Sequence, residues 1–140
     1  MSAALSRRWV ALALLVTCGC ASSTVATEAG RVSIGTWGGE HVLLTVTADG
    51  AHLDFDCASG DIMRPLTLDS NRRLAVDGVF LQKRGGPIRL GQEPDRKPAR
   101  YAGHLRDNTL TFDVVLLDSR ESVGSFTAIF GATPRLVRCL

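Results

Sequence analysis

The 140-residue sequence has no apolar segment long enough to cross a bilayer as a helix. Its N-terminal apolar stretch, Trp9 to Val16, is much shorter than the about 20 residues that a membrane-spanning helix needs. This stretch follows Arg7 and Arg8 and precedes a run of small residues, the order expected of an export signal. We therefore expect residues 1–19 to be a signal peptide and not a retained membrane span.

The sequence also lacks the short motifs of common catalytic and nucleotide-binding sites. It contains no Gly-x-Ser-x-Gly, no Cys-x-x-Cys, no Gly-x-x-x-x-Gly-Lys and no dinucleotide-binding glycine fingerprint. The glycine-rich stretch from Gly35 to Gly39 does not lie between a strand pattern and a helix pattern, which argues against a phosphate-binding loop. We expect a non-enzymatic protein without a cofactor.

A strong excess of charge of either sign is absent too. The chain has 16 Lys and Arg residues against 14 Asp and Glu residues, and removal of Arg7 and Arg8 with the signal would make the two numbers equal. A nucleic-acid-binding protein needs a basic face or stripe. The composition therefore argues against a nucleic-acid partner.

Cysteine is placed unusually at the end of the apolar stretch. Gly19-Cys20 resembles the bacterial lipoprotein signal, in which the chain is cleaved before a cysteine that carries lipid. That resemblance implies lipid attachment at Cys20, with Cys18 as the alternative. In a Gram-negative host, Ala21 and Ser22 after the lipidated cysteine imply an outer-membrane lipoprotein facing the periplasm. The alternative is an ordinary secretory signal and a soluble periplasmic or secreted protein.

Export sets the redox environment of the remaining cysteines. Disulfides persist in oxidising compartments, so Cys57 and Cys139 are a candidate pair. The alternative is two separate buried thiols.

The mature chain is expected to contain a tether and one domain. Residues 20–30 are small and polar and predict a lipidated cysteine followed by a flexible tether, and residues 31–140 predict a single β-domain. Val42, Leu44, Val46 and Ala48 share one face of a strand before the turn dipeptide Asp49-Gly50, which predicts a hairpin.

Period-two alternation continues through the domain. Eight or nine strands are expected, which predicts an antiparallel meander closed into a barrel or, alternatively, folded into a β-sandwich. Besides the hairpin strands, the expected segments are Arg31 to Trp37, Ile62 to Leu68 (weakened by Pro65), Arg73 to Lys83, Ala99 to Arg106, Leu110 to Leu116, Ser122 to Phe130 and Arg135 to Cys139. The long connection from Lys83 to Arg100 is expected to be a solvated loop over one barrel mouth.

The Gly35-x-Trp37 sequence at the start of this meander resembles the first strand of calycin-type barrels such as lipocalins and avidins. The resemblance implies a tryptophan that plugs one end of the barrel, and a small apolar ligand as one candidate partner. Trp37 and Tyr101 are the candidate plug or pocket residues, although the many Phe and Leu residues favour a filled interior. The stretches GTWGGEHV, DFDCA and PRLVRCL also resemble small exported bacterial proteins, which implies no specific activity.

Three polar side chains on the returning hairpin strand are the strongest candidates for chemistry. His52, Asp54 and Asp56 share one face, and imidazole and carboxylate groups can bind metal ions. A linear row on a barrel exterior does not converge on a pocket, so we expect a solvated strand face and no metal site. Glu40-His41 would point to opposite faces of a strand, and His104 is expected to be exposed.

Together these patterns predict an exported, lipid-anchored cell-envelope protein with a binding or interaction role. Its partners would be the membrane, through the lipid, and either a small apolar ligand or an envelope protein, which makes it a carrier or a protein-interaction or inhibitor module. The protein is expected to be a monomer.

Overall fold

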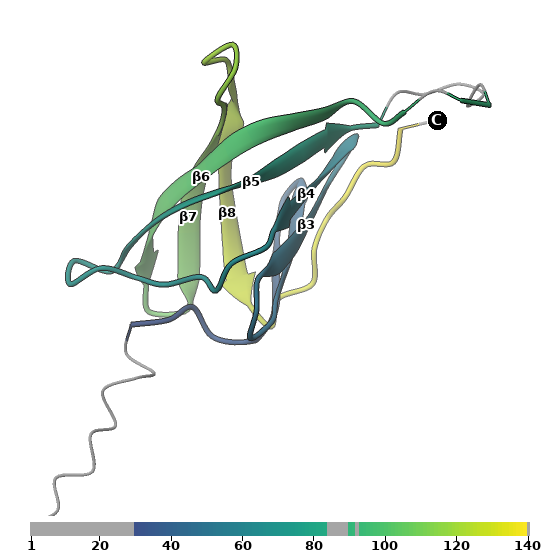
Figure 1. Ribbon diagram of the computed structural model, residues 1–140. Coiled ribbons are helices and arrows are strands. Elements are labelled where there is room, and N and C mark those ends of the chain that lie inside the picture. The colour runs from purple at the N-terminus through teal and green to yellow at the C-terminus, as the bar shows by residue number, and fades with distance from the viewer. Residues whose placement is uncertain (1–29, 84–89, 92, 140) are drawn as a thin grey trace, which may run out of the picture.

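The computed structural model describes residues 30–83, 90–91 and 93–139. These residues form eight antiparallel strands and no helix, and the meander closes into a barrel because β8 returns to β1 (Figure 1). The strands are β1 (Gly35–Gly39), β2 (Val42–Val46), β3 (Ala51–Phe55), β4 (Ala58–Ile62), β5 (Arg73–Gln82), β6 (Arg96–Arg106), β7 (Thr109–Leu116) and β8 (Ser122–Phe130). The predicted all-β barrel is confirmed, and the β-sandwich alternative is wrong.

The predicted signal peptide, Cys18, Cys20 and the tether up to residue 29 lie outside the described residues. Within the part of the chain that the structure describes, no helix is long and apolar enough to span a membrane.

The β2–β3 hairpin has the register that its sequence pattern predicts. Val46 pairs with Ala51, and the amide of Thr47 donates to the carbonyl of Gly50 at 2.9 Å. Val42 and Leu44 are buried on the inner face. Alternation of side chains was sufficient to predict this hairpin, because one of its faces is buried and the other is exposed to solvent.

The predicted strand from Ile62 to Leu68 is wrong, because β4 ends at Ile62 and the chain leaves the barrel wall there. Continuing the β4–β5 register would put Pro65 opposite Ala75 at a position where an amide must donate, and proline has no amide hydrogen. The chain crosses the end of the barrel instead, and the buried side chain of Leu66 enters the core.

The N-terminal segment of the domain lies against this crossing. The predicted strand from Arg31 to Trp37 is correct only from Gly35 onward, since Val32 precedes β1 and its amide donates to the carbonyl of Leu66 at 3.0 Å. Burial of Val32 and Leu66 draws both segments across the barrel end.

The long loop predicted from Lys83 to Arg100 is shorter in the structure, because β6 already begins at Arg96 and pairs with β5 from there. Pro98 is compatible with this strand, since it occupies a position of the β5–β6 ladder that needs no hydrogen bond. Its carbonyl faces the other neighbour and accepts from the amide of Leu117 at 2.9 Å. The proline and the charged residues suggested a loop because they give no apolar alternation.

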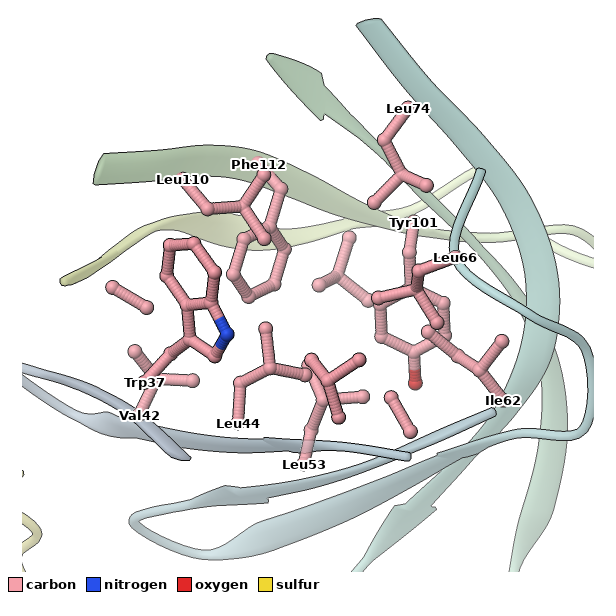
Figure 2. Close-up of a cluster of buried hydrophobic side chains, with 14 of the residues drawn as sticks. Trp37, Val42, Leu44, Leu53, Ile62, Leu66, Leu74, Tyr101, Leu110 and Phe112 are labelled. Carbon is pink, nitrogen blue, oxygen red and sulfur yellow. The ribbon is translucent and has the colours of Figure 1, made fainter. Parts of the chain in front are cut away.

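The barrel interior is occupied by side chains, of which Trp37 and Tyr101 are the largest that are fully buried (Figure 2). The phenol of Tyr101 reaches across to β4, where a Cβ atom on Gly60 would overlap its oxygen. Gly60 is therefore required for this packing. The other side chains with less than 2 % exposure are Leu44, Leu53, Leu110, Val42 and Val114.

The C-terminal segment runs back outside the wall from the end of β8, as the yellow trace shows (Figure 1). It lies so close to β1 that a Cβ atom on Gly38 would overlap the carbonyl of Ala132. The amide of Arg135 donates to Gly39 at 2.9 Å, and its carbonyl accepts from His41 at 2.8 Å. The predicted ninth strand, Arg135 to Cys139, is thus wrong: only an isolated parallel bridge forms at Arg135.

A disulfide joins this segment to the barrel. Cys57, just after β3, is bonded to Cys139, and their Cα atoms are 5.4 Å apart. The predicted pair is confirmed and the alternative of two free thiols is wrong. The bond ties the C-terminal segment across the end of the β2–β3 hairpin and closes a loop with a sequence separation of 82 residues.

We expect the double substitution Cys57→Ser with Cys139→Ser to lower the free energy of unfolding by about 4–5 kcal/mol, because the unfolded chain regains the entropy of a long open loop. Guanidinium unfolding followed by circular dichroism measures the change, and the reduced wild-type protein is the control. An unchanged unfolding midpoint would show that the bond contributes nothing to stability.

Candidate functional site

The polar row on β3 is divided among different partners. The Nδ1 atom of His52 lies 2.6 Å from Oδ1 of Asp61 on β4, and its Nε2 atom lies 3.6 Å from Oδ1 of Asp54. Lys83 reaches the same Asp54 oxygen at 3.7 Å. These groups are partly to largely exposed to solvent, and their contacts follow the outer surface of the wall.

Asp56 belongs to a second, separate group. Its Oδ2 atom lies 2.5 Å from Nδ1 of His41, and its Oδ1 atom accepts from the amide of Val137 at 2.7 Å. The carboxylate therefore fastens the C-terminal segment beside the disulfide. Although Asp56 follows the alternation of His52 and Asp54, its contacts are those of a structural residue.

Glu40 and His41 form the turn between β1 and β2, so the expectation that they occupy a strand is wrong. Glu40 pairs with Arg135 at 3.4 Å while His41 contacts Asp56. His104 is exposed on β6. Among the described residues, no three His, Cys, Asp or Glu side chains are grouped so that they could hold a metal ion.

Tyr101 is the only tyrosine of the chain and lies in the interior. Its hydroxyl donates to the carbonyl of Val79 at 2.9 Å. Burial, assisted by the negative charge of Asp61, raises the pKa of the Tyr101 phenol well above its usual range. The side chain is thus held in its neutral, hydrogen-bonded form.

Trp37 fills the interior nearer the seam where β8 meets β1. Its Nε1 atom donates to the carbonyl of Ser33 at 3.0 Å, and its ring meets that of Phe130 edge-on at 5.1 Å between centroids. Both large polar aromatics therefore satisfy their polar atoms with backbone carbonyls of this chain.

Two hollows lie on the surface, at opposite ends of the barrel. One, of about 310 Å³, is lined by the segment before β1, the β2–β3 turn and the crossing that contains Pro65 and Leu66. The other, of about 450 Å³, lies between the end of β3 and the C-terminal segment and includes Lys83 and Arg138.

The first half of β5 has an unpaired edge. The amide of Leu105 donates to the carbonyl of Arg72. By the alternation of an antiparallel ladder, the backbone amides and carbonyls of even-numbered β5 residues therefore point toward β6, and those of odd-numbered residues point toward the β4 side. Since β4 ends at Ile62, the amides and carbonyls of Ala75 and Asp77 have no hydrogen-bond partner among the described residues. Both residues are exposed.

The side chain of Asp77 is turned away from this edge, toward β6. Arg100 donates to both of its carboxylate oxygens, from Nε at 2.7 Å and from a terminal nitrogen at 3.1 Å. This hydrogen bonding holds the pKa of the Asp77 carboxyl below its usual range. The backbone groups of the β5 edge, which we define as those of Ala75 and Asp77, therefore remain accessible.

The β5 edge was not predicted from the sequence, although Pro65 indicates that strand pairing is disrupted nearby. Pro65 weakens the strand pattern in the sequence, but the register that sets it opposite Ala75 is a property of the folded sheet. Asp61 was also missed as the partner of His52, because strand pairing brings it there.

Comparison with protein-family models, curated proteins and solved structures finds no match. The eight-stranded antiparallel barrel is consistent with a calycin-like architecture.

Because Tyr101 is the only tyrosine, its ultraviolet absorbance reports its ionisation without ambiguity. A raised pKa in the folded state stabilises the fold below the ordinary tyrosine value of about 10, and that stability is lost as the pH rises above it. We expect tyrosinate absorbance to appear only as circular dichroism shows unfolding. Tyrosinate formation near pH 10 in folded protein would contradict the prediction, and protein unfolded in guanidinium is the control.

Proposed function

We propose that this is an exported, non-enzymatic protein of the bacterial cell envelope, anchored by lipid at Cys20, whose barrel binds another protein through its outer surface. The observation that carries the proposal of a protein partner is the unpaired β5 edge of Ala75 and Asp77. Exposed strand edges offer backbone donors and acceptors to an extended segment of a partner, which binds as an added strand.

The disulfide supports export. A bond between Cys57 and Cys139 persists in an oxidising compartment and would be reduced in most cytosols. The signal-like segment and Gly19-Cys20 supply the remaining support, from sequence alone.

The filled interior favours a protein partner over an apolar ligand. Trp37 and Tyr101 are each 1 % exposed and occupy the space that a carrier of this size would keep for its ligand. A partner strand at the β5 edge needs no displacement of these side chains.

Metabolic labelling of the full chain with radioactive palmitate in a Gram-negative host tests the anchor. We expect label in the wild type and in Cys18→Ala but none in Cys20→Ala. Label that persists in Cys20→Ala would move the attachment to Cys18, and an unlabelled wild type would overturn lipid anchoring.

A photo-crosslinking side chain in place of Arg73, two residues before Ala75 of the β5 edge, tests for the protein partner in cells of the source organism. We expect a discrete adduct that Ala75→Pro abolishes, because proline removes the unpaired amide hydrogen and no bond of the barrel. Ala75→Ser, which keeps the amide, is the matched control. A crosslinker at Asp113, on a strand paired on both sides, should give no adduct.

An adduct that survives Ala75→Pro, or one that forms equally from Asp113, would contradict binding at the β5 edge. Saturable binding of a fluorescent fatty acid to the mature chain, without any adduct, would support the carrier alternative instead.

A further inference from the structure

The described chain enters the barrel at one end, which we call the entry end. Odd-numbered strands begin there and even-numbered strands finish there, and the carbonyl of Gly30 accepts from Leu68 on the crossing between β4 and β5 (Figure 1). Cys20 lies ten residues before Gly30, and ten residues can extend over at most about 35 Å. If Cys20 carries lipid, as proposed above, the entry end is the part of the barrel held nearest the membrane.

Four large apolar side chains are exposed at the entry end, and one of them is Ile129, which is 46 % exposed one residue before the end of β8. Ile34 before β1 is 63 % exposed, Met63 after β4 is 84 % exposed, and Phe130 at the end of β8 is 42 % exposed. Each lies just beyond or at the limit of its strand, where alternation no longer directs it into the core. The Phe130 ring packs over the position of Gly35, next to Ile34 in the chain.

The hollow of about 310 Å³ adjoins Ile34. Ile34 forms part of its wall, with Ala48 from the β2–β3 turn and Pro65 from the crossing. An end that combines exposed apolar side chains with a hollow lined by both apolar and polar residues can insert into the boundary between lipid headgroups and acyl chains.

Charge at the entry end fits an anionic surface. The described residues around it carry more arginines than acidic groups: Arg31, Arg64, Arg72, Arg73 and Arg106 against Asp49, Asp69 and Asp107. The carboxylate of Asp69 keeps its negative charge and accepts from the amides of Asn71 and Arg73 at 2.8 Å each. Arginines at this level attract the phosphates of anionic lipids.

We propose that the entry end is a membrane-contact surface, which rests on the phospholipid layer that holds the anchor. Ile34, Met63 and Phe130 insert at headgroup depth, and Arg31 and Arg64 bind lipid phosphates. The inference depends on the proposed lipid anchor for its biological setting. It concerns a surface of the barrel itself, so it can be tested with and without lipid on Cys20.

The first experiment uses the mature chain with Cys20→Ser and vesicles of phosphatidylethanolamine and phosphatidylglycerol in a co-sedimentation assay. We expect weak binding that Ile34→Ser, Met63→Ser and Phe130→Ser together reduce by about tenfold, since interfacial binding scales with buried apolar area. The matched control is Leu90→Ser, Leu117→Ser and Val137→Ser, which removes three exposed apolar side chains at the opposite end and should change nothing.

Phe130 also packs on Trp37, so its substitution could disturb the fold. The double variant Ile34→Ser with Met63→Ser avoids this and should reduce vesicle binding by about threefold. Arg31→Gln with Arg64→Gln should weaken binding only to vesicles that contain phosphatidylglycerol. Equal losses in the entry-end and control variants would overturn the proposal. Dimerisation that the triple variant abolishes would also overturn it, because a second copy would then cover this surface.

The second experiment uses the acylated protein in vesicles with bromine-labelled acyl chains. Trp37 is 1 % exposed and is shielded from the bromine atoms by the barrel wall, so Ile129, which is 46 % exposed on β8, is replaced by tryptophan as the reporter. We expect quenching of this reporter that the double variant reduces. Acylated protein without quenching would overturn the membrane-contact surface while leaving the anchor intact. Absence of lipid on Cys20, together with normal vesicle binding, would overturn the anchor while leaving the membrane-contact surface intact.

Discussion

Closure of the barrel depends on a short seam between the first and last strands. Only two residue pairs, Trp37 with Phe130 and Gly38 with Ile129, join β1 to β8 in register. A seam of this length leaves few ladder hydrogen bonds, and an unclosed sheet would expose two edges. The indole of Trp37 lies directly inside the seam and packs edge-on against Phe130, so closure of the wall and filling of the core are coupled.

The C-terminal segment reinforces the same seam from outside. Gly131 donates to the carbonyl of Thr36 at 2.8 Å, and Arg135 continues the contact along β1. Asp56 and the disulfide at Cys139 then fasten the segment to the far side of the β2–β3 hairpin. This arrangement explains why Asp56, although it lies in a polar row, has the contacts of a structural residue.

The distribution of satisfied and unsatisfied polar groups separates the interior from the exterior. No buried side-chain nitrogen or oxygen lacks a hydrogen-bond partner in the described part of the chain, and the phenol of Tyr101 and the indole of Trp37 both donate to backbone carbonyls. Such an interior offers a ligand no free donor or acceptor. The unpaired polar groups instead lie on the outside, on Ala75 and Asp77, where water or another chain can reach them.

Most of the fold was predictable from local pattern. Alternation located the β2–β3 hairpin and the inward positions of Tyr101 and Leu105, because a strand with one dry face must alternate. The expected export made Cys57 and Cys139 a candidate pair, and the structure contains their bond. The predicted strand from Ile62 to Leu68 failed because long-range contacts decided the path of the chain. The segment crosses the barrel end, where the side chain of Leu66 is buried in the core.

The candidate sites divide in the same way. From sequence alone, His52 and Asp54 could be assigned to one outer face, and Pro65 could be recognised as a residue that disrupts pairing. The partner of His52 and the backbone groups left free by Pro65 depend on strand register. Register is set by contacts among residues far apart in the chain, so only the tertiary structure decided that Asp61 meets His52 and that the backbone groups of Ala75 on the β4 side meet no strand.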